Sequence, residues 1–197
     1  MYAITAADSP NDLPLLLHLT QASRHDSGTF VAAYAQLRQL YPNLSFSKAL
    51  LDSAHDAYEI YRLLNSHTVE PFIDLNDRRG QKPKFSAFKI NKFGKPICIE
   101  NLEMINCGFI KERSRIKWRC PMYKQLDCCP KKHECSPSAY GRVVYTKPND
   151  DPRLFTKTPR DSKAWKKIYA KRTSVERTLK RILVDYDIEN LRLRAEK

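Results

Sequence analysis

Two short groups of residues combine types and spacing that suit chemistry on phosphate groups. In the first, LLDSAHDAY (50–58), an apolar run leads directly into Asp52, and His55 and Asp56 follow one turn further on. A carboxylate at the carboxyl end of a strand in an open α/β sheet lies where such folds bind ligands. The alternative is structural, because an aspartate at a strand–helix junction is a common helix cap.

The second group is Tyr169, Arg172 and Glu176 in WKKIYAKRTSVERTLKR, where steps of three and four put the three side chains on one helical face. Arg172 occupies a position between Ile168 and Val175 in a stripe of apolar residues. A guanidinium there requires an anion, which Glu176 or a bound phosphate would supply. An ordinary surface ion pair between Arg172 and Glu176 is the alternative interpretation.

The elements that must position these residues follow a β-α-β-α-β order. Runs of β-branched and aromatic residues indicate the strands, and apolar residues at steps of three and four indicate the helices. This order implies crossover connections and a mostly parallel sheet covered by helices, an α/β fold. The predicted elements are a strand over 2–7, a helix over 27–41, a strand over 46–52, a helix from about 56 to 65 and a strand over 69–75.

Changes in pattern divide the chain into three parts. Residues 1–76 hold the alternating elements. Residues 77–156 are rich in Lys, Arg, Pro and Cys, with short strand-like pieces at 95–99 and 142–146, and we interpret them as a basic, cysteine-containing insertion. Residues 157–197 are predicted to return to the core as helices.

The predicted C-terminal helices begin near Ser162 and include a second, short helix over 187–194. The first of them has basic residues around an apolar stripe, as expected for a helix that buries one face. The stripe consists of Trp165, Ile168, Val175, Leu179 and Ile182.

The charge of the chain favours polyanionic partners. Its net charge is +13, and by region the Lys and Arg minus Asp and Glu counts are 4 − 8 = −4 for 1–76, 18 − 8 = +10 for 77–156 and 13 − 6 = +7 for 157–197. An acidic first part with a basic remainder suits a nuclease whose carboxylates gather metal ions while other segments hold DNA. A nucleic-acid-binding module without catalysis accounts for the basic charge equally well.

Cysteines crowd into the insertion, in RCPMYKQLDCCPKKHEC. Cys120, Cys128 and Cys135 are candidate zinc ligands, because a loop with little apolar content gains stability from a metal clip. The spacing is not a pair of Cys-x2-Cys knuckles, so free thiols remain the alternative. No apolar run approaches the ~20 residues of a membrane span, and no signal peptide is recognised, so we expect a cytoplasmic protein with no membrane partner.

Four blocks together resemble one family. The Tyr-x2-Arg-x3-Glu spacing, with PRDSKAWKKIY and RVVYTKPNDDPRLF before it, resembles the signature around the last catalytic carboxylate of bacterial insertion-sequence transposases of the DDE type. LLDSAHDAYEIYRLLNSHTVEPFIDLN resembles the region of their second carboxylate, and AADSPNDLPL with RHDS resembles the strand and loop before it. The resemblance covers essentially the whole chain.

The resemblance implies an RNase H-like mixed sheet with flanking helices, and it implies roles for particular residues. Asp52 would be the second catalytic carboxylate and Glu176 the third, together holding Mg²⁺ or Mn²⁺, while Tyr169 and Arg172 would hold phosphates. The usual lysine seven residues after the glutamate is replaced by Leu183, and the nearest substitutes for its DNA-positioning role are Lys180 and Arg181.

The family's first catalytic aspartate lies on the first strand of its sheet, upstream of anything that matches here, so we expect an N-terminally incomplete core. The implied function is DNA transposition by metal-dependent strand cleavage and strand transfer, in a truncated form. Its partners would be transposon ends and target DNA, with a possible homodimer, near the bacterial nucleoid. The alternative is a non-catalytic nucleic-acid-binding remnant.

Overall fold

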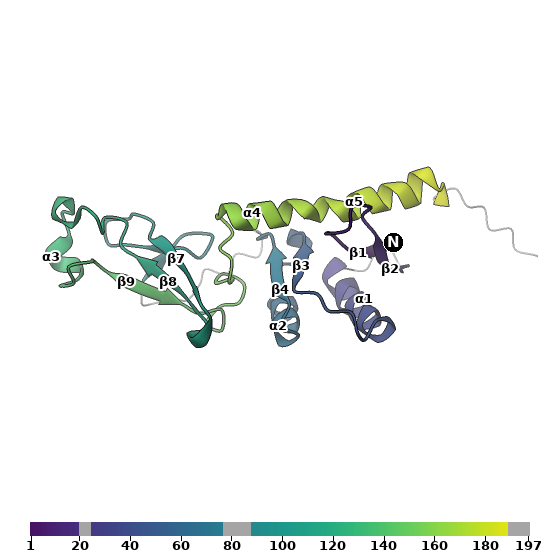
Figure 1. The fold of residues 1–197 in the computed structure, drawn as a ribbon, viewed down its shortest axis with the longest axis horizontal. Coiled ribbons are helices and arrows are strands. Elements are labelled where there is room, and N and C mark those ends of the chain that lie inside the picture. Colours follow the sequence, from purple (N-terminus) through teal and green to yellow (C-terminus); the bar gives the residue numbers. More distant parts are fainter. Residues whose placement is uncertain (20–24, 77–87, 189–197) are drawn as a thin grey trace, which may run out of the picture.

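The computed structural model describes residues 1–19, 25–76 and 88–188 of the chain. The first part alternates strands and helices, and the mixed content agrees with the predicted α/β class (Figure 1). Its elements are β1 (Tyr2–Thr5), β2 (Pro14–His18), α1 (Asp26–Leu40), β3 (Lys48–Leu51), the 3-10 turn η1 (Ser53–His55), α2 (Tyr58–Ser66) and β4 (Glu70–Ile73).

These four strands form two separate pairs. β3 and β4 are parallel and in register from Lys48↔Glu70 to Leu51↔Ile73, and α2 makes the crossover between them. The predicted parallel crossover is therefore confirmed for this pair. β1 and β2 form an antiparallel pair and β1 does not pair with β3, so the predicted mostly parallel sheet is wrong for the first strand, and α1 does not connect two paired parallel strands.

β2 corrects the prediction that only one strand precedes the first helix. Pro14 opens β2, a position where proline removes no essential ladder hydrogen bond. The run that follows, Leu15 to Leu17, has no alternation of polar and apolar residues. The pairing with β1, a tertiary contact, makes this segment a strand.

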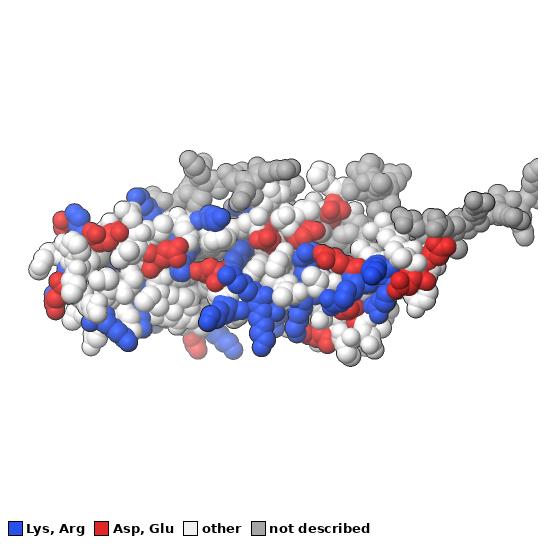
Figure 2. Space-filling view, turned by 90° about the horizontal axis from the view of Figure 1, so that it is seen from above, with Lys and Arg blue, Asp and Glu red and all other residues white. Residues whose placement is uncertain are grey.

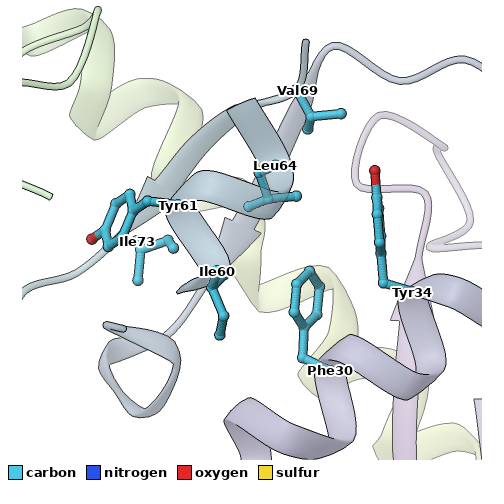
Figure 3. Packing of buried hydrophobic residues seen from close by; sticks show 7 residues of the cluster. All are labelled: Phe30, Tyr34, Ile60, Tyr61, Leu64, Val69 and Ile73. Carbon is cyan, nitrogen blue, oxygen red and sulfur yellow. The ribbon is translucent and has the colours of Figure 1, made fainter. Parts of the chain in front are cut away.

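The core of the first part lies between α1, α2 and β4 (Figure 3). Phe30 and Tyr34 on α1 stack with ring centroids 5.5 Å apart and face the buried side chains of α2. The two helices are predicted by the same 3.6-residue spacing that lets each bury one stripe. The buried cluster consists of Phe30, Tyr34, Ile60, Tyr61, Leu64, Val69 and Ile73.

The described part of the insertion forms a second module with its own small core. The predicted strands at 95–99 and 142–146 appear as shorter strands, and Met104, Ile116 and Trp118 are buried between them. Its helix and strands are β5 (Lys89–Ile90), β6 (Pro96–Ile97), β7 (Ile105–Ile110), β8 (Arg115–Arg119), α3 (Lys132–Cys135) and β9 (Val143–Thr146), with β7-β8-β9 forming one antiparallel sheet. The 3-10 turns are η3 (Lys111–Arg113) and η4 (Leu126–Cys128).

The segment after β9 ties the second module to the first through buried polar contacts. The Arg153 guanidinium binds both carboxylate oxygens of Asp56, at 2.6 to 2.9 Å, and both side chains are buried. Arg160 donates to the Ile73 carbonyl at 2.9 Å and to the Tyr61 hydroxyl at 2.8 Å. Removal of Arg153 would leave a buried carboxylate without its countercharge, and removal of Arg160 would take its donor from the Ile73 carbonyl and the Tyr61 hydroxyl.

The C-terminal part is one long helical run, as predicted from the apolar stripe. It consists of α4 (Lys163–Tyr169), the 3-10 turn η5 (Ala170–Arg172), α5 (Thr173–Lys180) and a π turn, η6 (Arg181–Asp185). The run lies along β4, β3 and β1 on the side opposite α1 and α2 (Figure 1). The Ser162 side chain caps its start by accepting from the Trp165 amide at 3.1 Å, and most of the helix predicted over 187–194 lies outside the described residues.

Between β1 and β3 the first part contains an open slot. The two strands belong to different sheets, and in the described ranges no backbone hydrogen bond joins them. A cavity of about 640 Å³ lies between their edges, with α1 on one side and the C-terminal helical run on the other. We call this cavity the β1–β3 slot.

Candidate active site

Asp52 lies directly beyond the carboxyl end of β3, where the sequence predicts it. Its Oδ1 accepts from the Ala54 amide at 3.1 Å and from His55 Nδ1 at 2.6 Å, so it also caps η1. The hydrogen bond from His55 is the main cause that lowers the pKa of Asp52, with smaller contributions from Ala54 and from the charge of Arg172. The carboxylate is half-exposed and stays ionised at neutral pH.

A buried hydrogen-bond chain orients Asp52. The His55 ring is 5% exposed, and its Nε2 lies 2.9 Å from the Tyr2 hydroxyl. Burial and the charge of Asp52 raise the pKa of Tyr2, so its hydroxyl keeps its proton. Because the ionised Asp52 carboxylate can only accept, Nδ1 of His55 carries the hydrogen, and in the neutral ring Nε2 then accepts a hydrogen bond from the Tyr2 hydroxyl. Nδ1–H then donates to Asp52. The sequence places His55 near Asp52, but the partner Tyr2, 53 positions away, has no sequence signal.

The helical run brings the second predicted group to the same place. Arg172 pairs with Glu176 at 2.9 Å, and the charge of the same guanidinium lowers the pKa of Asp52. Tyr169 lies one turn before Arg172; its hydroxyl donates to the Leu51 carbonyl at 3.2 Å, which ties the helix to the end of β3. The local i,i+4 ion pair is therefore present, and it lies beside the strand end that carries Asp52.

A further carboxylate, Asp74, belongs to this region and is missed by the motif analysis. The β3–β4 register ends at Leu51↔Ile73, so Asp52 and Asp74 follow on neighbouring parallel strands, which lie ~4.8 Å apart. Burial and then the charge of Asp74 raise the pKa of Tyr169 to about 12. The sequence signal is the same one that marks Asp52, an apolar strand that ends in an aspartate.

The donor set of Asp52 and Glu176 suits a hard divalent cation but does not complete a site for one. Both carboxylates are about half-exposed, and Asp52 Oδ2 accepts no hydrogen bond from the described residues. Carboxylate oxygens are the ligands that Mg²⁺ and Mn²⁺ prefer. Within 1–19, 25–76 and 88–188, no three His, Cys, Asp or Glu side chains form a group that could hold a metal ion.

The two basic residues predicted to position DNA, Lys180 and Arg181, differ in their surroundings. Arg181 donates to the backbone carbonyls of Asn11 and Asp12, at 2.7 and 2.9 Å, and so holds the turn after β1. Arg177 supports the same turn through two hydrogen bonds to the Asp12 carboxylate. Lys180 is exposed and makes no hydrogen bond or ion pair with any described residue, so its charge is available to a ligand.

Basic side chains gather on two surfaces of the molecule. Figure 2 shows Lys and Arg concentrated over the α4 end of the helical run, where Lys163, Lys166 and Lys167 are exposed. The second surface is the face of β8 opposite its buried Ile116 and Trp118. It carries Arg115, Lys117 and Arg119, which we call the β8 basic stripe.

Aromatic rings support the β8 basic stripe. The Arg115 guanidinium lies 3.6 Å from the ring centroid of Tyr145, and the Arg119 guanidinium lies 3.5 Å from that of Tyr123. Stacking on a ring holds a guanidinium in place without neutralising its charge. The stripe therefore presents two ring-supported guanidinium groups, with Lys117 between them, to an anionic ligand.

The cysteines of the insertion are free thiols in this structure. Burial is the main cause that raises the pKa of Cys135, and the thiols of Cys120, Cys98 and Cys129 add to it. Cys128 is exposed and is not among these neighbours. Thiols are suitable donors for zinc, but the described residues hold no three-ligand group, so zinc stays a prediction.

Comparison with known proteins gives a family. A family model of the transposase DDE domain matches residues 1–197. Searches of curated proteins and of solved structures found no match. Within the described ranges, no helix is long and apolar enough to cross a membrane. Because the family match spans all 197 residues, the chain belongs to the transposase DDE domain family.

Proposed function

We propose that this chain contributes two carboxylates, Asp52 and Glu176, to a metal-dependent centre that cleaves and joins DNA strands at transposon ends. Its family acts in DNA transposition, and DNA is therefore its substrate. The observation that supports the specific proposal is the position of Arg172, which pairs with Glu176 at 2.9 Å and lines the same cavity as Asp52, whose pKa its charge also lowers. The two carboxylates are 176 − 52 = 124 positions apart in the sequence, yet one guanidinium acts on both.

The chain's own residues would hold and orient the DNA. A phosphate near Asp52 would meet the guanidinium of Arg172, which forms charge-assisted hydrogen bonds with phosphate oxygens. Tyr169 fixes the helix against the end of β3. Lys180 would contact the phosphate backbone further along the DNA strand. Arg181, which the resemblance offers as an alternative, is engaged with the turn after β1.

Asp52 and Glu176 would hold Mg²⁺ or Mn²⁺, which supplies the charge that stabilises attacking and leaving oxygens in phosphodiester cleavage. His55 keeps the Asp52 carboxylate in one orientation, and Tyr2 keeps His55 in the tautomer that donates to it. Two carboxylates give such ions few fixed ligands. We therefore propose that the 197-residue polypeptide binds DNA but does not cleave it, and that its sheet is an incomplete RNase H-like one.

The alternative function is DNA binding without catalysis, favoured by the β8 basic stripe. The two functions differ in their response to metal, because a binding module needs no cation. The test measures affinity for a duplex carrying the element's ends, with Mn²⁺ and with EDTA. We expect Mn²⁺ to tighten binding in the wild type and in the control Glu112→Gln, and to have no effect in Asp52→Asn or Glu176→Gln. Equal affinity with and without Mn²⁺ in the wild type would favour the alternative.

We also propose that cysteines of the insertion bind zinc. Burial raises the pKa of Cys135, the charge of Arg142 lowers it, and Cys120, Cys98 and Cys129 raise it further, so these four thiols lie in one region of the insertion. Metal analysis of the purified protein should give about one zinc per chain. A protein free of zinc after purification without chelators would remove this proposal.

A further inference from the structure

The β8 basic stripe runs along the middle of a partly exposed sheet face. β8 is the central strand of the β7-β8-β9 sheet, and the core of the second module packs against its other face, at Ile116 and Trp118. The two residues paired with Arg119 share the face of the stripe, as partners in antiparallel strands do. They are Ile105 on β7 and Val143 on β9, 38% and 39% exposed. This face, which we call the stripe face, therefore combines a row of cations with apolar flanks.

The cations of the stripe have no acidic partner within the described ranges. Arg115, Lys117 and Arg119 form no ion pair there. The Nε atoms of both arginines are buried and have no hydrogen-bond partner among the described residues. A half-buried guanidinium without a countercharge favours binding of an anion from outside the chain.

The spacing of the stripe favours a chain of anions over a single one. Alternate residues of a strand lie about 6.6 Å apart, so the three cations form a row about 13 Å long. A small phosphate compound would reach only part of this row. A nucleic-acid backbone carries charges at regular intervals and would reach all of it.

The rings behind the two arginines add a feature that binding of phosphate does not require. The guanidinium carbon of Arg115 lies over the ring of Tyr145, and that of Arg119 lies over the ring of Tyr123. Each stack therefore turns one flat face of a guanidinium away from its ring. Nucleic-acid bases stack on such guanidinium planes. In a duplex the faces of the bases are covered by neighbouring base pairs, so this contact requires unpaired bases.

We propose that the stripe face binds an unpaired segment of DNA. Lys117 and the N–H groups of the two arginines bind the phosphates of one strand, and bases stack on the outer faces of the guanidinium groups of Arg115 and Arg119. The apolar flanks, Ile105 and Val143, pack against the sugars and bases. A duplex also offers the phosphates of one strand to the stripe, but it cannot make the stacking contacts.

The role of this face rests on the proposed function, because strand cleavage at a transposon end leaves a free strand end that can separate from its complement. Binding of unpaired DNA does not rest on that function. It is measured in EDTA and with any base sequence, so its failure would leave the proposed centre of Asp52 and Glu176 standing. Failure of that centre would equally leave the stripe face standing.

Two probes separate stacking of bases from attraction to phosphates. One is a fluorescent thymine strand of about eight nucleotides, and the other is an abasic strand of the same length, with the same phosphates and no bases. Both are titrated with the 197-residue chain in EDTA and followed by fluorescence anisotropy. We expect the thymine strand to bind roughly tenfold or more tightly than the abasic strand. A surface that attracts phosphates alone would bind the two equally.

The variant that locates this binding is Arg115→Lys with Arg119→Lys, which keeps both charges and removes both flat guanidinium faces. Affinity for the thymine strand should fall at least about fivefold, while the slope of log Kd against log salt stays unchanged. Each single variant should lose part of this affinity. The matched control is Arg113→Lys, because Arg113 is exposed and has no ring contact among the described residues.

Duplex DNA of the same length checks that the double variant is folded. Its affinity should change by less than about twofold, because the charges that reach its phosphates are kept. Equal binding of the thymine and abasic strands, or full affinity for the thymine strand in the double variant, would overturn the proposal. So would an equal loss of affinity for duplex and unpaired DNA. Tighter binding of the matching RNA strand would assign the face to RNA instead.

Discussion

The two modules of this chain place charge in opposite ways. In the first module, charged side chains lie at strand ends and are held by long-range contacts, as His55 and Tyr2 hold Asp52. In the second module, the β8 basic stripe lies along one strand and is held by rings on neighbouring segments. The first arrangement fixes a few groups at one point, and the second spreads cations along a surface.

This difference suggests a division of labour. Chemistry at one phosphate requires groups fixed at one point, whereas affinity for a polyanion depends on the number of cations that reach it. We therefore expect substitutions in the first module to change metal dependence, and substitutions in the second to change affinity and its dependence on salt.

The largest effect should come from the junction of the modules. Arg153→Ala leaves the fully buried Asp56 carboxylate without its ion-pair partner, although the Tyr61 hydroxyl and the Asn76 amide still donate to it, and this costs about 3–5 kcal/mol. We expect a Tm lower by roughly 6–20 °C in thermal unfolding followed by circular dichroism. The matched control is Lys132→Ala, which removes a surface pair with the exposed Asp127 and should change the Tm little. Equal shifts in the two variants would show that the buried pair does not join the modules.

The second effect concerns the β8 basic stripe. Lys117→Ala with Arg119→Ala removes two cations from the half-buried basic face of β8, so the slope of log Kd against log salt should fall by about 2 when both contact phosphates. Fluorescence anisotropy with duplex DNA between about 50 and 200 mM salt measures the slope. Lys131→Ala, whose lysine is paired with Glu134 on the surface, is the control. An unchanged slope in the double variant would mean that DNA binds elsewhere.

A smaller effect is expected in the pH dependence of stability. The folded-state pKa of Asp52 lies below its ordinary value of 3.8, so its contribution to stability is present above that value and lost as the pH falls through the folded pKa. The Tm difference between wild type and Asp52→Asn should therefore shrink between about pH 5 and pH 2, in EDTA. Tyr2→Phe removes the hydroxyl that bonds His55, the residue that donates to Asp52. It should shift this pH transition only slightly. A Tm difference that grows on acidification would contradict the assignment.

The smallest effect distinguishes the roles of the two neighbouring basic residues of the helical run, Lys180 and Arg181. Arg181→Ala removes hydrogen bonds to the carbonyls of Asn11 and Asp12, so the Tm should fall by a few degrees. Lys180→Ala should leave the Tm unchanged and weaken DNA binding several-fold. The reverse pattern would mean that Arg181, and not Lys180, positions DNA.

Local signals predicted much of this structure. The helix and strand positions around Asp52 and the helical face of Tyr169, Arg172 and Glu176 follow from periodicity and spacing. β2 was missed because pairing with β1 makes it a strand. The partners Tyr2 and Arg153 were missed because the side chains they contact are 53 and 97 positions away, and no local pattern marks such contacts.

The central claim is that Asp52 and Glu176 serve one divalent cation. Electron paramagnetic resonance of Mn²⁺ titrated into the protein–DNA complex measures this affinity directly, in wild type, Asp52→Asn, Glu176→Gln and the double variant. We predict that each single variant weakens Mn²⁺ binding at least about tenfold. The double variant should lose little more affinity, because the losses caused by removing two ligands of the same ion are not additive. Additive losses, or single variants that bind Mn²⁺ as tightly as the control Glu112→Gln, would contradict the account.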